Sequence, residues 1–343
     1  MIWHPLLQAI LALDLLALLL LGLASWTAVQ ALLAWQPRSA SARQLRLEAR
    51  LEIASLQGRA VAILQMLALI LLVVAIASAL PPLVRGAMCG TGALNALGPE
   101  GPRLLLVRVF ALLLLHGWRV LDGLNRQAPQ GPLSLAVAKG LLLALPAVAL
   151  IPPLTLEAFL ALEPGRPVDC CAVVYDNFAS LAQAGRLWGV DNSLWLAAML
   201  AGAGLVLALA LAAILRPAAM LARAWPLALS TCLWVPVAAI ALVRVLAAYH
   251  YGVLHHHCPW CLFLDAQYHV GYPLWGSLLT LLLLGLTPLL LRGAVGVAPE
   301  LRPAALRHLR RSAMLQFCLL LLFLTLATAP ALLWRLKAGV WLG

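Results

Sequence analysis

The segment of this 343-residue chain best equipped for chemistry reads His255-His256-His257-Cys258-Pro259-Trp260-Cys261. Two cysteines separated by two residues bring their sulfur atoms within reach of one metal ion or of each other. The three preceding histidines add imidazole ligands, or they lower the pKa of Cys258 and make it a reactive thiolate. A structural disulfide is the plain alternative, although so small a loop gains little stability when it is closed.

Two further cysteine groups lie in other loops. Cys170 and Cys171 follow Asp169, and adjacent cysteines seldom bond to each other because the intervening peptide must distort. They more easily bind one soft metal or bond to two different partners, of which Cys89 is one. Met88 and Cys89 form a soft ligand pair next to glycines that permit a tight turn. A structural disulfide between these two loops, and a plain turn after Met88, are the alternatives.

These residues make two overlapping candidate sets. A redox site would use the five loop cysteines, Cys89, Cys170, Cys171, Cys258 and Cys261. A metal site would draw on the same sulfurs together with Met88, His255, His256 and His257. The other two cysteines, Cys232 and Cys318, fall inside apolar stretches and are expected to be small packing residues.

The amino-acid composition indicates the environment that surrounds most of the chain. Hydrophobic residues make up 64% of the chain and charged residues 10%, with a mean hydropathy of +0.99. A soluble domain carries about a quarter charged residues, so we expect a lipid bilayer as the chain's main partner. The net charge of +11 comes from arginines in short loops between apolar stretches. That charge therefore indicates membrane topology, and we expect no nucleic-acid partner.

Eight apolar stretches are long enough to cross a bilayer, which takes about 20 residues. They must be helical, because hydrocarbon cannot satisfy exposed backbone groups. The sequence therefore predicts an all-α polytopic membrane helix bundle with spans near 10–35, 60–82, 104–121, 133–156, 193–215, 225–247, 268–291 and 313–334. The charged stretch Ser39–Arg59 is interpreted as a solvated loop, with a short amphipathic surface helix as the alternative.

The distribution of basic residues predicts the orientation. The loops after the first, third, fifth and seventh spans hold 15 Lys and Arg, and the opposite side holds 6. By the positive-inside rule the basic loops face the cytoplasm and both termini lie outside. All five loop cysteines then face the periplasm of a bacterial inner (plasma) membrane, a compartment in which thiols are paired, metal-bound or redox-active.

The spans form a single integral-membrane domain over residues 1–343. Two four-helix halves, 1–162 and 193–343, are joined by the outer cysteine-containing loop 163–192. The halves share orientation and loop pattern, so a parallel internal duplication is one interpretation.

Ionisable side chains inside the spans form another prediction. Asp14, Arg108, Glu157 and Arg244 lie at similar depth in apolar surroundings. Because a charge in hydrocarbon is costly without a partner, we expect the two acids to lie close to the two arginines.

The motif Cys258-Pro259-Trp260-Cys261-Leu262-Phe263 resembles the C-x-x-C of membrane thiol oxidases and of the vitamin K epoxide reductase type. The resemblance implies electron transfer from periplasmic dithiols to quinone, with Cys89 and Cys170 or Cys171 as the second cysteine pair. It covers about ten of the 343 residues, and those proteins are compact four-helix bundles. Leu264-Asp265-Ala266 also stands where the bacterial oxidases often carry a basic residue.

Two functions from different classes follow. The first is binding or transfer of a soft metal, copper above all, because imidazole and thiolate suit copper and sulfur-rich sites select Cu(I). The second is a quinone-linked thiol–disulfide oxidoreductase. Either would work with a periplasmic partner such as a metallochaperone, a cytochrome or a thiol carrier, and either requires the cysteine loops to converge. A structural subunit whose cysteines only staple loops is the third alternative.

Overall fold

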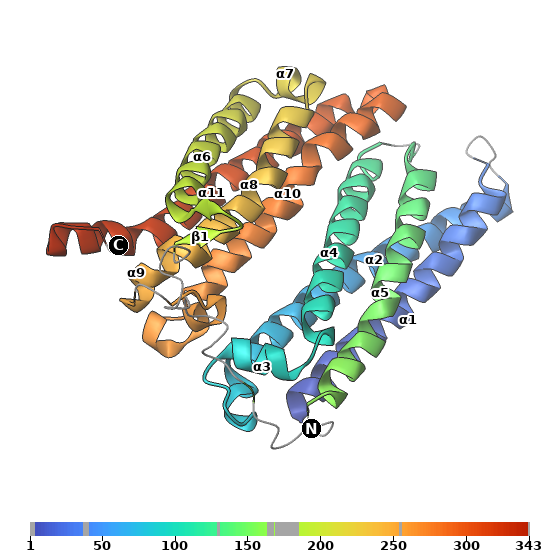
Figure 1. The fold of residues 1–343 in the computed structure, drawn as a ribbon. Helices are drawn as coiled ribbons and strands as arrows, with labels where there is room; N and C mark the ends of the chain where they lie inside the picture. Colours follow the sequence, from blue (N-terminus) through green and yellow to red (C-terminus); the bar gives the residue numbers. More distant parts are fainter. Residues whose placement is uncertain are drawn as a thin grey trace. The chain divides into compact units, whose positions relative to one another are not determined.

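A computed structural model of the chain describes residues 4–36, 41–128, 131–162, 168, 185–253 and 256–341. Within these ranges it contains eight helices long and apolar enough to cross a membrane, which confirms the all-α polytopic bundle (Figure 1). They span Pro5–Ala34, Ala42–Ala79, Glu100–Asn125, Ser134–Leu160, Asn192–Leu215, Trp225–Tyr251, Gly271–Val297 and Pro299–Ala338. Each overlaps one predicted span, and their apolar surfaces imply contact with lipid.

The chain divides into two compact units. The first comprises residues 1–75, 94–164 and 290–305, and the second comprises 76–93, 165–289 and 306–343.

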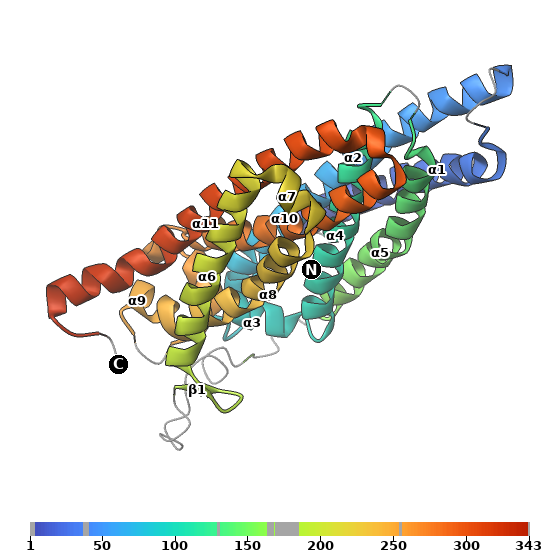
Figure 2. The same cartoon turned by 90° about the horizontal axis from the view of Figure 1, so that it is seen from above.

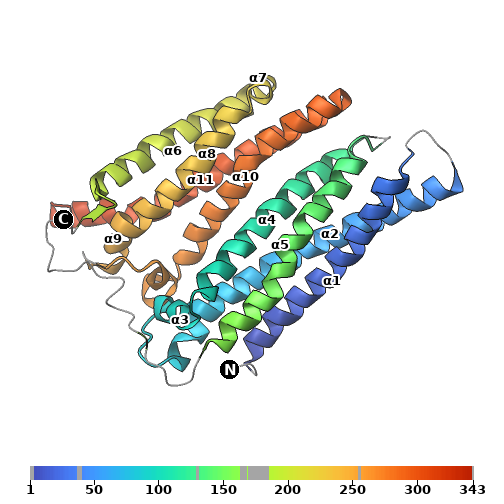
Figure 3. The same ribbon diagram turned by 45° about the vertical axis from the view of Figure 1, so that its right-hand side comes forward.

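In the first unit, four long helices pack together: α1 (Pro5–Ala34), α2 (Ala42–Val74), α4 (Glu100–Asn125) and α5 (Ser134–Leu160). Helix α1 packs against α2 and α5, and α4 packs against α5 and α2 (Figure 3). Trp118 of α4 is buried at this contact. A Cβ at Gly58 of α2 would lie 2.5 Å from its ring, and one at Gly140 of α5 would lie 3.0 Å away. The two glycines therefore make the space that a buried indole needs.

Helix α2 corrects the interpretation of the stretch 39–59 as a solvated loop. From Ala42 onward this stretch is helical and continuous with the second span. The Ser41 side chain caps the helix by accepting a hydrogen bond from the backbone N–H of Gln44, as a Ser-x-x-Gln start favours. Further along, Ser55 and Arg59 bind Asp122 of α4, so one polar face of the stretch is held by tertiary contacts.

The buried ion pair expected inside the membrane is present in the first unit. Arg108 of α4 donates to both carboxylate oxygens of Asp14 of α1, at 2.6 and 2.9 Å, and both side chains are fully buried. Thr155 and Gln65 complete the group around the guanidinium. The expected role of Glu157 is not confirmed, because its side chain is exposed and forms no ion pair with a described residue. It lies two residues from Thr155, about 200° around the helix.

The second unit contains the other transmembrane helices: α6 (Asn192–Leu215), α8 (Trp225–Ala241), α10 (Gly271–Val297, up to residue 289) and α11 (Arg302–Ala338, from residue 306). These four helices lie together (Figure 2). Their side chains share one apolar core. Trp234 is one of the buried residues of this core. Its ring lies edge-on to Phe323 at 5.6 Å, and its N–H donates to the carbonyl oxygen of Met199.

Shorter elements of the second unit lie between or beside the spans. The second span ends in a π-helical turn, Ala75–Ala79, followed by a 3-10 turn, Pro81–Leu83, and helix α3, Gly90–Ala96. After α8, a π-helical turn (Leu242–Leu246) leads into α9 (Ala247–Tyr251), and 3-10 turns follow at Pro259–Phe263 and Asp265–Gln267. The remaining short elements of this unit are strands β1 (Arg186–Leu187) and β2 (Val190–Asp191) and helix α7 (Pro217–Ala222). The 3-10 turn Pro299–Leu301 belongs to the first unit.

Arg244 of the second unit lies in the π-helical turn after α8. Its guanidinium donates to the carbonyl oxygen of Arg186, and its own carbonyl accepts from Asn192. These two contacts join Arg244 to a backbone carbonyl group and to a side-chain amide group.

Candidate metal centre

Three cysteines of the second unit come together from two separate segments. Cys89 immediately precedes α3, while Cys258 and Cys261 lie at the start and in the middle of the 3-10 turn Pro259–Phe263. Gly252 ends α9 in a left-handed conformation (φ 65°), which turns the chain out of the helix. Pro259 then starts the 3-10 turn, where its fixed φ suits the first helical position. One turn of helix therefore presents Cys258 and Cys261 to the same place.

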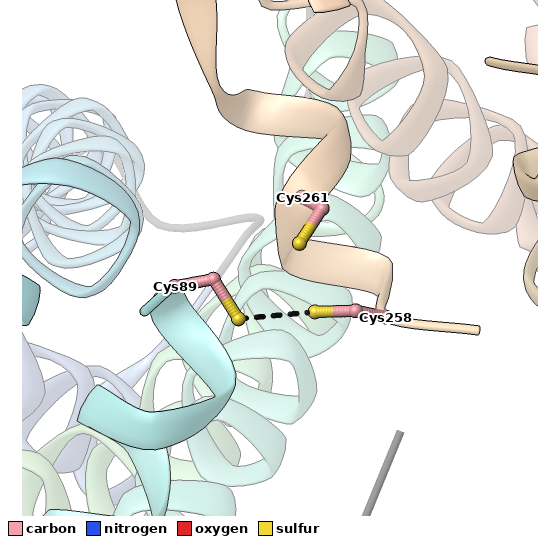
Figure 4. Close-up of side chains that lie close together, drawn as sticks. All are labelled: Cys89, Cys258 and Cys261. Carbon is pink, nitrogen blue, oxygen red and sulfur yellow. Dashed lines mark hydrogen bonds between the residues drawn. The ribbon is translucent and has the colours of Figure 1, made fainter. Parts of the chain in front are cut away.

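The sulfur atoms of these three cysteines form a compact group. All three lie within 4.8 Å of one another (Figure 4). The Cys89 and Cys258 sulfurs are 3.3 Å apart, and the Thr91 hydroxyl oxygen lies 3.0 Å from the Cys258 sulfur. Cys89 and Cys258 are buried, and Cys261 is half-buried. The convergence predicted from the sequence is confirmed for these two loops, and the group could hold a metal ion.

Glycine allows the two segments to approach so closely. A Cβ at Gly90 would lie 2.8 to 2.9 Å from three ring atoms of Trp260, so the indole packs directly on the start of α3. The Trp260 ring also packs against the Phe263 ring, with the ring centroids 5.5 Å apart. Because Trp260 lies between Cys258 and Cys261 in the chain, its contact with Gly90 fixes how both sulfurs face Cys89.

We expect Gly90→Ala to destabilise the fold by about 1–3 kcal/mol, the usual cost of forcing an extra methyl group into a packed site. Elsewhere in a helix the same change stabilises by about 0.5–1 kcal/mol. Gly276→Ala in α10 is the matched control, since nothing lies within 4 Å of its Cβ position. Thermal unfolding in detergent measures both, and equal midpoints for the two variants would show that Trp260 does not constrain Gly90.

Histidine lies beside the cluster on the more exposed side. The Nε2 atom of His256 is 3.2 Å from the Cys261 sulfur, and its ring stacks edge-on against Tyr251 at 4.8 Å. The Tyr251 hydroxyl donates to the carbonyl oxygen of Cys258. His257 is buried. Of the predicted imidazole ligands, His256 therefore lies in contact with a sulfur of the cluster.

The other predicted site residues either lie in described parts of the chain, as Met88 does, or fall outside the described residues. Met88, which directly precedes Cys89, is 75% exposed. His255, Cys170 and Cys171 lie outside the described residues. The backbone N–H of Val168 donates to the carbonyl oxygen of Arg85 at 3.0 Å, four residues before Cys89. Cys232 and Cys318 lie in α8 and α11, inside the spans as predicted.

Electrostatics at the cluster favour a thiolate at Cys258. Hydrogen bonds from the side chains of Cys261, Cys89 and Thr91 stabilise its charged form and lower its pKa to about 3, although burial opposes the shift. The pKa of Cys261 is raised, chiefly because its thiol donates to that thiolate. Burial lowers the pKa of His256, which favours the neutral imidazole that binds metals. The metal-free site therefore offers one thiolate and a neutral imidazole at neutral pH.

This low pKa predicts an unusual pH dependence. We expect the rate at which Cys258 of the metal-free protein reacts with methyl methanethiosulfonate to change little between pH 8 and pH 5. An unperturbed thiol, with a pKa near 8.5, loses about tenfold per pH unit below that value. Mass spectrometry of the Cys258 peptide measures the rate. Thr91→Val, which removes one donor, should move the onset of the decline to higher pH, whereas an ordinary tenfold slope in the unchanged protein would contradict the prediction.

Sequence reasoning missed Thr91 and Tyr251 as parts of this site. Thr91 follows Cys89 by two residues and lies in the first turn of a helix. Tyr251 ends α9 and reaches the Cys258 carbonyl across seven residues. The signal available in the sequence was the presence of a hydroxyl side chain close to each cysteine segment.

Comparison with known proteins adds no relative. The chain matches no protein-family model, no curated protein and no solved structure. The motif similarity to membrane thiol oxidases therefore stays at the level of a few residues, and the geometry of the cysteine cluster carries the functional argument.

Proposed function

We propose that this membrane protein binds a soft metal ion, Cu(I) above all, through the thiolates of Cys89, Cys258 and Cys261. The observation that supports this is the meeting of three sulfurs from segments 169 residues apart in the sequence, within 4.8 Å of one another. A metal bound by three sulfurs at about 2.3 Å needs sulfur–sulfur separations of this order. A structural disulfide between two loops needs only two cysteines, so it would not explain a third sulfur at the same point.

The chemistry of the ligands favours copper over the harder divalent metals. Sulfur-rich sites select Cu(I), and Cu(I) accepts fewer ligands than the tetrahedral set that structural zinc takes. Zinc binding would need a fourth ligand, and His256, 3.2 Å from the Cys261 sulfur, is the described residue in position to supply it. The number and type of ligands therefore distinguish the two metals.

The site and its surroundings suggest a route for the metal. We place the cysteine segments on the periplasmic face of a bacterial inner membrane, with both termini outside, because the basic loops lie on the other side. Cys261 is half-buried and His256 lies beside it, whereas Cys89 and Cys258 are buried. A soluble carrier with thiolate or thioether ligands would deliver the ion to Cys261, and the two inner sulfurs would complete its coordination.

Titration of the purified, reduced protein tests the proposal. With Cu(I) held by a chromophoric chelator, we expect one ion per chain to transfer, and X-ray absorption should show sulfur ligands at about 2.3 Å. Cys232→Ser with Cys318→Ser is the matched control, because both residues lie inside spans away from the cluster. If the triple change of Cys89, Cys258 and Cys261 to Ser binds Cu(I) as tightly as this control, the proposal is wrong.

A second candidate function is thiol–disulfide exchange coupled to quinone. This function is favoured by the low pKa of Cys258, which makes Cys258 a thiolate nucleophile. The Cys89 sulfur lies 3.3 Å from it. In that reaction a partner dithiol reduces a Cys258–Cys261 disulfide and leaves as a disulfide, and two electrons and two protons pass on to quinone. Dithiol-dependent reduction of a soluble quinone by the purified protein would support this function, and its absence would leave metal binding as the better account.

A further inference from the structure

We propose that Cys89 and Cys258 are also a redox pair, so that a disulfide between them closes the metal site and its reduction opens the site again. This inference rests on the proposed metal-binding function and adds its regulation. In the reduced state three sulfurs face one point, and in the oxidised state two of them bond to each other. Metal occupancy then follows the thiol–disulfide balance of the compartment that the site faces.

The geometry of the pair carries the inference. The two sulfurs are in contact at 3.3 Å, and a disulfide bond requires about 2.05 Å, so an approach of about 1.3 Å suffices. They come from opposite sides of the cluster, Cys89 from the start of α3 and Cys258 from the start of the 3-10 turn (Figure 4). Trp260 packed on Gly90 holds these two segments together. Small side-chain rotations can therefore form the bond while the helices stay in place.

Burial makes the pair selective toward oxidants. Cys89 is 3% exposed and Cys258 is fully buried, whereas Cys261 is half-buried and flanked by His256. An external disulfide therefore approaches the cluster from the Cys261 side, and exchange ends with Cys89 and Cys258 bonded to each other. The net reaction converts two protein thiols and one external disulfide into the Cys89–Cys258 disulfide and two external thiols, with Cys261 returned as a thiol.

The consequence for metal binding follows from ligand number. Once Cys89 and Cys258 are bonded to each other, Cys261 and His256 are the described residues of the cluster still able to coordinate. A single thiolate with one imidazole falls short of the three or four ligands of a tight site. Linkage also requires the reverse effect: a bound ion that uses both sulfurs must protect the pair from oxidation.

The experiment uses the full-length protein in detergent. The metal-free protein is incubated with oxidised glutathione, and peptides are mapped by mass spectrometry without reduction. We expect a Cys89–Cys258 cross-link, a fall of at least about 100-fold in Cu(I) affinity, full recovery after treatment with a phosphine reductant, and slower cross-linking when Cu(I) is bound first. Cys89→Ser should lose the cross-link, and Cys232→Ser should keep both the cross-link and the affinity change.

Other outcomes overturn the inference in distinguishable ways. If the reduced protein binds Cu(I) but oxidation links Cys89 to Cys170 or Cys171, or leaves Cys89 and Cys258 unlinked, the switch is wrong and metal binding stands. If the cross-link forms but the reduced protein binds no Cu(I), the metal-binding function fails and the control of metal occupancy fails with it. If oxidation links the pair and Cu(I) affinity is unchanged, the third sulfur and His256 suffice, and the switch is again wrong.

Discussion

Replacing Arg108 with methionine should cost about 3–5 kcal/mol of stability, the range measured when one partner of a buried ion pair is removed. The pair joins α1 to α4 within the first unit, with Arg108 and Asp14 both at 0% exposure. Methionine fills much of the arginine's volume but leaves the Asp14 carboxylate without its counter-charge. Thr155 still donates one hydrogen bond to that carboxylate at 3.1 Å, which offsets only a small part of the loss.

The expected loss of stability comes from leaving the Asp14 carboxylate buried without a counter-charge, and it does not measure the net contribution of the ion pair. Removing both charges together, as in Asp14→Leu with Arg108→Met, should therefore recover most of the stability, because well-packed apolar replacements for a buried pair are often neutral or stabilising. Inside a membrane this expectation is reinforced, since the surrounding spans are themselves apolar.

Arg103→Met on the same helix is the matched control for Arg108→Met. Arg103 pairs with Glu100 at 3.3 Å, but its side chain is 64% exposed, and exposed pairs contribute about 0–1 kcal/mol. Thermal unfolding in detergent should then show a large loss for Arg108→Met, a small one for Arg103→Met and a partial or full recovery for the double variant. A loss for Arg108→Met no greater than that of the control would contradict a charge-dependent role.

The positions of the spans could be predicted from the sequence because they depend on local composition. A run of about 20 apolar residues has few alternatives to a membrane helix, and each of the eight predicted spans overlaps a helix of the structure. The helical start of α2 had a local signal too, the Ser41-x-x-Gln44 cap, but it was outweighed by the charges of the following residues. One of those charges, Arg59, is paired with Asp122 of α4, 63 residues away, and Ser55 binds the same carboxylate.

Side-chain partners were less predictable because they depend on how each helix is rotated. Depth in the membrane correctly matched Asp14 with Arg108, but it could not show that Glu157 points away from the pair while Thr155 points toward it. The same limit applied to the cysteines. Loop positions predicted that Cys89 would meet the Cys258 segment, whereas the 3.3 Å sulfur contact depends on the packing of Trp260 against Gly90, which no spacing rule describes.

Among single changes at the cluster, Cys258→Ser should have the largest effect on metal binding. Cys258 is fully buried, and its sulfur contacts the Cys89 sulfur and the Thr91 hydroxyl, while its backbone carbonyl is held by Tyr251. It is also the thiol with the lowered pKa, so it is the ligand already deprotonated before the ion arrives. Serine keeps the shape and the loop but offers a hard, protonated oxygen that Cu(I) disfavours.

The expected order of effects tests whether the cluster acts as one site. Loss of a direct ligand in Cys258→Ser should lower Cu(I) affinity by more than about 100-fold, whereas loss of an outer contact in Thr91→Val should cost about 10–100-fold. Chelator competition on purified protein measures both, with Cys232→Ser as the control that changes a cysteine outside the cluster. Because the apolar core of the second unit is formed mainly by side chains of its long helices, all three variants should unfold within a few degrees of the unchanged protein. Equal Cu(I) affinities for Cys258→Ser and Cys232→Ser would show that the sulfur at the centre of the group is no ligand.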